Sequence, residues 1–154
     1  MKVAKSVEQA CSILAVLAEH HGGPVTSCEL NKRLAVSPSY LTKIMRRLVV
    51  SGIIASTQGV NGGYVLARPM NAITLKMVVI AIEGNEPLFT PSGVIKRTFR
   101  NRKRVADRGL KSLSDGFAAA EAAWLARLDK VTMEPLITSS LGDDTDPTSD
   151  IDKK

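Results

Sequence analysis

The chain has 154 residues, 44% of them hydrophobic, which is enough for one compact domain with an appendage and too little for several domains. No apolar run approaches the roughly 20 residues of a membrane-spanning helix, and no leader with a cleavage site is visible, so we expect a cytoplasmic protein without membrane contact. The net charge is +6, with the excess of Lys and Arg in residues 1–70 and 88–111 and the excess of acids in 112–154. This asymmetry suggests a polyanionic partner.

The first helix is predicted by apolar residues that recur three and four positions apart over residues 7–18. Ser6 and Gln9 form a capping-box pattern at its start. It should stop at the Gly-Gly-Pro of residues 22–24, because glycine can take a left-handed cap conformation and proline cannot continue a helix.

Two shorter helices should follow with the spacing of a helix-turn-helix. Thr26 with Glu29 is a second capping box, and its helix should end near Ala35. Ser37 is a good N-cap and Pro38 takes the favoured first helical position of the next helix. The turn between them has about three residues, which is typical of a helix-turn-helix.

The third helix should present two different faces. Its inward stripe comprises Leu41, Ile44, Met45 and Leu48. Polar side chains at its start and on its other side are candidate DNA contacts: Ser37, Ser39, Tyr40, Thr42, Lys43, Arg46 and Arg47. We expect the earlier of them at base edges or phosphates of the major groove and the two arginines nearer the backbone. The alternative is a polar face that only contacts water.

A glycine-rich hairpin, or wing, is predicted over residues 53–67. Asn61 and Gly62 are typical of the positive φ angles that a tight hairpin turn needs. Gln58, Asn61 and Gly62 are candidate contacts to the minor groove or its phosphates, with an ordinary turn as the alternative. The hairpin and the preceding helices predict a winged helix-turn-helix over residues 1–83.

The second half should form a linker and a dimerisation region over residues 84–136. A helix over residues 73–82 is apolar nearly all round and must be covered on several sides. The basic run 96–104 could be a second phosphate-contacting surface, a solvated face or a flexible loop. A long helix near 114–131 should form a homodimer through one stripe: Phe117, Ala120, Trp124, Leu128 and Val131. Residues 137–154 have the acidic, polar composition of a disordered tail.

Few side chains are candidates for other chemistry. Cys28 would be the second residue of its helix, where the dipole favours a thiolate, so it is a possible redox thiol, although most isolated cysteines sense nothing. Cys11 is more simply a small core residue, and Trp124 could line an effector pocket instead of an interface. We expect the adjacent His20 and His21 to be solvated at a helix end rather than to bind metal. No catalytic order, nucleotide loop or metal-ligand spacing indicates an enzyme.

Five segments in order carry a family resemblance: KSVEQACSIL, SPSYLTKIMRRLVVSGIIAS, GVNGGYVLARP, ITLKMVVIAIEG and LDKVTMEPL. Over roughly residues 1–135 the chain resembles the IscR-like, or Rrf-two, family of bacterial transcription regulators. The resemblance implies a winged-helix part that binds double-stranded DNA, a long crossing dimer helix and operators with dyad symmetry.

The chain departs from this family at three places. Members with an iron-sulfur cluster use three cysteines between the apolar helix and the dimer helix, but residues 84–116 here contain none, so we expect no cofactor and the cluster-free branch. Gln58 stands where many members have an arginine. Thr42 and Lys43 replace a common polar or acidic pair, so the operator sequence should differ.

Together these observations predict a mainly α-helical protein with a two-stranded wing that acts as a dimeric, sequence-specific DNA-binding repressor. The competing class is a winged helix used as a protein-interaction module without specific DNA binding. A small-molecule or redox effector remains open.

Overall fold

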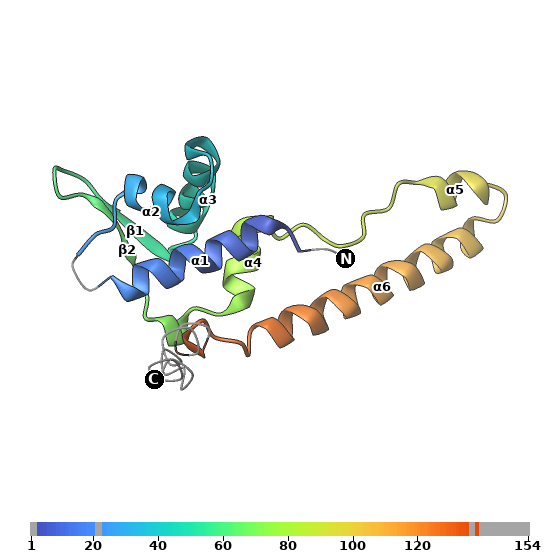
Figure 1. Ribbon diagram of the computed structural model, residues 1–154. Coiled ribbons are helices and arrows are strands. Elements are labelled where there is room, and N and C mark those ends of the chain that lie inside the picture. Colours follow the sequence, from blue (N-terminus) through green and yellow to red (C-terminus); the bar gives the residue numbers. More distant parts are fainter. Residues whose placement is uncertain (1–2, 21–22, 136–137, 139–154) are drawn as a thin grey trace, which may run out of the picture.

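The computed structural model describes residues 3–20, 23–135 and 138. The tail expected over residues 137–154 therefore lies outside the described residues, apart from Thr138. The elements in chain order are α1 (Lys5–Glu19), α2 (Ser27–Leu34), α3 (Pro38–Val50), β1 (Ile54–Thr57), β2 (Gly63–Leu66), the short 3-10 helix η1 (Met70–Ala72), α4 (Leu75–Glu83), α5 (Val94–Thr98) and α6 (Lys103–Leu128). Helices α1 to α4 and the hairpin gather at one end, and α6 runs from them toward α5 at the other (Figure 1). The expected fold class, mainly helical with a small two-stranded sheet, is confirmed.

The helix starts follow the sequence only in part. Thr26 caps α2 as expected, because its hydroxyl accepts a hydrogen bond of 3.2 Å from the Glu29 amide. The capping box expected at the start of α1 is wrong, since the helix begins at Lys5 and its N-cap is Ala4. The Ala4 amide instead donates to the Glu83 carboxylate at 2.7 Å. A side chain at the end of α4 thus accepts a hydrogen bond from a backbone amide at the start of α1.

The core lies between α1 and α4 and joins all three N-terminal helices to β1. The expected inward stripe of α3 is confirmed, with Leu41, Ile44, Met45 and Leu48 each at most 3% exposed. They pack with the buried residues of the other elements, among them Ile13, Leu14, Leu30, Ile54, Val78 and Ile82. Each such side chain contributes about 1.5–3 kcal/mol through burial. The core therefore holds α3 with one face inward and its polar face outward.

The hairpin turns at a different residue from the one expected. Strands β1 and β2 pair antiparallel from Ile54 opposite Leu66 to Thr57 opposite Gly63. The positive φ angle in the connection belongs to Gly59, at 111°, and neither Asn61 nor Gly62 has one. Gly62 is needed for another reason, since a Cβ there would lie 2.5 Å from the Thr57 carbonyl oxygen. The predicted role of Asn61 and Gly62 in setting the turn is therefore wrong.

Helix α6 is longer at its start than the sequence indicated. It begins at Lys103 rather than near Ser114, and it ends at Leu128 rather than near Val131. Gly109 did not interrupt it, because that glycine faces open space and its backbone stays helical. The basic run 96–104 thus lies mostly in α5 and the first turn of α6, with every side chain exposed. Residues 99–102 lie between the two helices, and the three interpretations of the run (a solvated face, a phosphate-contacting surface and a flexible loop) all stay predictions.

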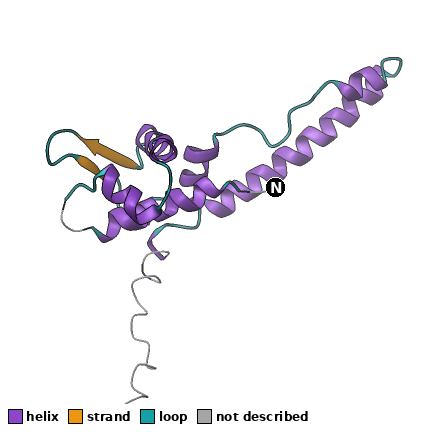
Figure 2. Ribbon diagram, turned by 45° about the horizontal axis from the view of Figure 1, so that its top comes forward, coloured by secondary structure: helices purple, strands orange, loops and turns teal. Residues whose placement is uncertain are grey.

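The end of α6 is fixed to the winged part by main-chain hydrogen bonds. The Leu75 amide donates to the Val131 carbonyl at 2.8 Å, and the Met133 amide donates to the Ile73 carbonyl at 2.9 Å. The other end of α6 projects beyond the bundle with α5 (Figure 2). Among the described residues, no helix is both long and apolar enough to cross a membrane.

Candidate nucleic-acid interface

The outward face of α3 carries most of the side chains that the sequence predicts as DNA contacts. All seven candidates from Ser37 to Arg47 are exposed. Within the part of the chain that the structure describes, Lys43 and Arg46 have neither a hydrogen bond nor an ion pair. The Thr42 hydroxyl donates to the Pro38 carbonyl of its own helix at 2.9 Å. The face therefore presents two cations that are free to meet phosphates or base edges.

Arg47 differs from Arg46 because it also has a structural contact. Its guanidinium donates to the carbonyl of Ile82 near the end of α4. This bond ties α3 to α4 and takes one of the five N–H donors of the guanidinium. We expect Arg47 to orient α3 as well as to face DNA, which the sequence alone did not indicate.

The wing lies beside the start of α2 rather than directly beside the cations of α3. Gln58 and Asn61 are exposed and Gly62 is half-buried. Gln58 and Gly62 line a shallow cavity of about 340 Å³ together with Thr26 and Ser27 of the α2 cap. The structure thus adds these two hydroxyl residues to the candidates, and only the tertiary pairing of Val25 with Tyr64 could have revealed them.

An open cavity of about 720 Å³ lies between α3 and α4. Its lining residues are Lys43, Arg46, Arg47, Val50, Ser51, Ile53, Lys76, Met77, Ile80, Ala81 and Asp129. Three of the predicted DNA-contacting residues therefore also border a pocket whose floor belongs to α4. This cavity could not be predicted from local sequence patterns, because its walls come from segments far apart in the chain.

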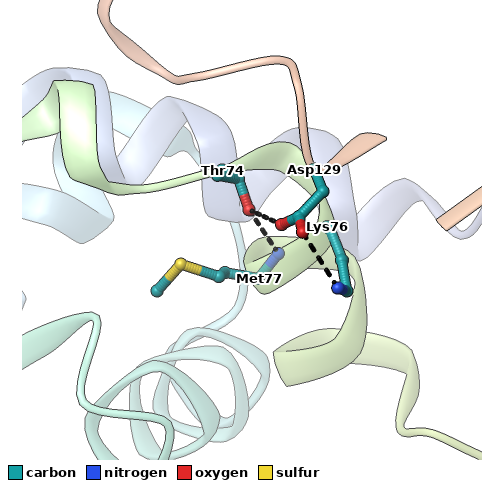
Figure 3. A network of polar contacts seen from close by, with 4 residues as sticks. All are labelled: Thr74, Lys76, Met77 and Asp129. Carbon is teal, nitrogen blue, oxygen red and sulfur yellow. Dashed lines mark hydrogen bonds and ion pairs between the residues drawn. The ribbon is translucent and has the colours of Figure 1, made fainter. Parts of the chain in front are cut away.

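Lys76, Met77 and Asp129, which line this cavity, belong to a polar network with Thr74 (Figure 3). Asp129 accepts hydrogen bonds of 3.1 Å from both the Thr74 hydroxyl and the Lys76 ammonium group. Thr74 in turn caps α4 by accepting from the Met77 amide at 3.3 Å. The hydrogen bond from Lys76 is the main reason that the pKa of Asp129 lies below its ordinary value.

The lowered pKa of Asp129 predicts a pH-dependent contribution to stability. The ionised carboxylate is bound better in the folded chain, so its contribution is present above the ordinary aspartate pKa of about 3.9 and is lost as the pH falls through the lowered value. We expect Asp129→Asn to lower the urea midpoint at pH 7 and to have a smaller effect near pH 3. Measuring urea unfolding at the two pH values tests this, and an equal loss at both would contradict it.

The two cysteines lie in different environments. Cys28 is exposed and is the second residue of α2, as expected. Cys11 packs partly against the core, and burial raises the pKa of its thiol. His20 is half-buried after the end of α1, and His21 lies outside the described residues. No group of three or more His, Cys, Asp or Glu side chains in the described ranges could hold a metal ion.

The stripe predicted for the dimer divides into two parts. Trp124 and Leu128 pack against the core of their own winged part, and the Val131 carbonyl bonds to the start of α4. Phe117 and Ala120 are exposed, and the Phe117 ring stacks on Phe89 with centroids 5.0 Å apart. Phe117 and Ala120 are therefore the more exposed part of the predicted stripe.

The sequence-based prediction missed further exposed apolar residues next to this more exposed part. We call residues 88–117 the arm. Its large exposed hydrophobic residues are Leu88, Val94, Phe99, Val105, Leu113 and Phe117, each 44–51% exposed. Val105 and Leu113 are eight residues apart and Leu113 and Phe117 are four apart, so each lies on the same side of α6 as the next in this series. The sequence predicted that the long helix begins near Ser114, so Val105 and Leu113 were not recognised as part of its apolar surface.

Comparison with known proteins agrees with this geometry. The model of the Rrf2 family, described as an iron-dependent transcriptional regulator, matches residues 3–139. The chain is 39% identical over 100 residues to YwgB of Bacillus subtilis, named as an HTH-type transcriptional regulator, over 64% of each chain. It is 35% identical over 72 residues to the HTH-type transcriptional regulator IscR of Erwinia tasmaniensis, over 47% of this chain and 44% of that one. The matches thus span less than two thirds of these relatives.

A solved structure described as a transcriptional regulator from Lactobacillus plantarum shares the fold. It superposes with a TM-score of 0.70 at 22% identity and covers 90% of this chain and 91% of that one. Helices α1 to α3, of which α3 has the outward basic face, form a winged helix with the hairpin, and the family model and the relatives are DNA-binding transcription regulators rather than enzymes. The chain belongs to the Rrf2 family.

Proposed function

We propose that the chain is a homodimeric repressor that binds a dyad DNA site in the cytoplasm and occludes a promoter. The observation that carries this proposal is the outward face of α3, where Lys43 and Arg46 have no partner among the described residues. The buried stripe of the same helix fixes its orientation. In this arrangement α3 enters the major groove, and the wing and the α2 cap contact the flanking backbone.

The arm supports the homodimer. Its exposed apolar residues lie on a segment that projects from the bundle, and burying such a stripe against a second copy removes it from water. Two copies related by a twofold axis present two α3 helices. Their half-sites are expected about one helical turn, roughly 34 Å, apart.

We propose that this regulator needs no iron-sulfur cluster, although the family model is described as iron-dependent. A cluster of the family type requires three thiolates from the segment between α4 and α6. The whole chain has two cysteines, Cys11 on α1 and Cys28 on α2, and residues 84–116 contain none. The donor set of one chain does not fit such a cluster, so the regulatory signal must be of another kind.

A DNA titration combined with a mass measurement tests the proposed function. The purified chain is mixed with a labelled duplex from upstream of its own gene, and with an unrelated duplex of equal length. We expect two chains to bind per operator, with much weaker binding to the unrelated duplex. Equal affinity for both duplexes would contradict sequence specificity, and no binding to either would favour a protein-interaction module.

Cys28 offers a candidate redox switch. It is exposed at the start of α2, the helix before α3, and peroxide would oxidise its thiol to sulfenic acid with release of water. We expect peroxide to weaken DNA binding by the wild-type chain and to leave binding by Cys28→Ser unchanged. Gel-shift titrations before and after treatment measure this, with Cys11→Ser as the matched control. If peroxide leaves DNA binding by the wild-type chain unchanged, Cys28 is not a redox switch.

A further inference from the structure

The cavity between α3 and α4 has the size and the composition of a small-molecule site. Its volume of about 720 Å³ falls within the roughly 300–1,000 Å³ typical of ligand pockets. It is bordered by α3, by α4 and by Asp129 just after α6, so its walls come from three separate segments.

The floor of the cavity is apolar. Met77, Ile80 and Ala81 of α4 are half-buried there, and Val50 at the end of α3 is 80% exposed. A flat aromatic or aliphatic group placed against these side chains would remove apolar surface from water. The floor therefore suits the hydrophobic body of a ligand.

The rim of the cavity is positively charged. Lys43, Arg46, Arg47 and Lys76 border it, and Asp129 is the single acidic residue of the lining. Asp129 is already bound to Lys76 at 3.1 Å, and Arg47 donates to the Ile82 carbonyl. Lys43 and Arg46 have no such partner within the described residues. The rim thus has an excess of cationic groups that an anion would neutralise.

We propose that this cavity binds a small organic anion with an aromatic or aliphatic body, and that the bound anion releases DNA. The body lies against α4 and Val50, and the anionic group meets Lys43 and Arg46. The same two cations are assigned to DNA, so ligand and DNA compete for them. Binding of the anion stands on the cavity alone, whereas the release of DNA rests on the proposed function. By linkage, the factor by which the ligand weakens DNA binding equals the factor by which DNA weakens ligand binding.

Anilinonaphthalene sulfonate is a suitable probe, because it joins an aromatic body to an anionic group and fluoresces in apolar sites. The full chain is titrated with it in the absence of DNA. We expect Val50→Glu to weaken binding by about tenfold or more, because a carboxylate at the mouth repels the sulfonate. Val50→Lys should bind at least as well as the wild type. Val50 is largely exposed, so neither change disturbs the core.

Val60→Glu is the matched control. Val60 is a fully exposed valine on the wing and does not border the cavity, so the same substitution there should leave probe affinity unchanged. In a second titration, the probe is added to the complex of the chain with its upstream duplex. We expect the apparent DNA affinity to fall as the cavity fills, and to fall less for Val50→Glu.

Four results would count against the proposal. Equal probe affinity for Val50→Glu and the wild type would mean that the probe binds elsewhere, and equal losses for Val50→Glu and Val50→Lys would remove the role of charge. A probe affinity that falls as the chain dimerises would show that a second copy covers the cavity. Undiminished DNA affinity at saturating probe would refute the competition, whereas a chain that binds no DNA without the probe would refute the proposed function instead.

Discussion

Replacing Lys43 and Arg46 together with alanine should lower the affinity for the operator by at least about thirtyfold, because each contact of this kind is worth roughly 1–3 kcal/mol. Both side chains are exposed and have no partner among the described residues, so the melting temperature should stay the same. A gel-shift titration at fixed salt measures the loss. The slope of affinity against salt should also fall by close to one unit for each lost phosphate contact.

The matched control for this variant is Arg127→Ala with Lys130→Ala, which removes the same charge from exposed positions at and just after the end of α6. If affinity depends on net charge alone, the two double variants will lose equally. Undiminished affinity after the loss of Lys43 and Arg46 would contradict the assignment of α3 as the recognition helix.

Placing glutamates at Val105 and Leu113 should convert the dimer to a monomer. The two side chains are 49% and 44% exposed in the single chain, so folding tolerates the change, whereas a dimer would have to bury four added charges. We expect the dissociation constant of the dimer to rise at least about a hundredfold. Light scattering should then report the chain mass of 16.5 kDa rather than twice that value.

The same arm variant should lose most of its affinity for a two-half-site operator, because two linked α3 helices bind far more tightly than one. Val60→Glu serves as a control for the mass measurement alone, since it adds a charge at an exposed valine outside the arm but lies on the wing that is proposed to contact DNA. An arm variant that remains dimeric would show that the chain associates through another surface.

Local patterns in the sequence predicted the part of the site that local physics determines. The apolar spacing of Leu41, Ile44 and Leu48 identified both faces of α3, because a helix with one buried stripe must expose the other side. The cap at Thr26 was likewise visible, since its bond reaches only three residues ahead. The helix-turn-helix therefore followed from spacing and capping residues, and the wing followed from two short strands around a glycine-rich connection.

The errors arose where tertiary contacts override local signals. The start of α1 depends on Glu83, which is distant in the chain, so the capping pattern at Ser6 was misleading. The turn of the wing uses Gly59 rather than Asn61 and Gly62. Similarly, the predicted dimer stripe could not reveal that Trp124 packs against its own core. Spacing identifies an apolar face but not the surface that covers it.

The cavity beside α3 was beyond sequence reasoning for the same reason. Its floor comes from α4, and its cations come mainly from α3. Asp129 comes directly after Leu128, the last residue of α6. Lys43 and Arg46 could be recognised as DNA-binding candidates from one helix alone. That the same two residues also border a cavity can be seen only from the packing of three segments in the structure.

Selection of bound sequences from a random pool of DNA duplexes tests the central claim most directly. A dimeric regulator should enrich one motif with two inverted half-sites about one helical turn apart. This enrichment should be lost when Lys43 and Arg46 are replaced. A pool that shows no enriched sequence, or a single asymmetric site occupied by one chain, would contradict a dimeric DNA-binding regulator.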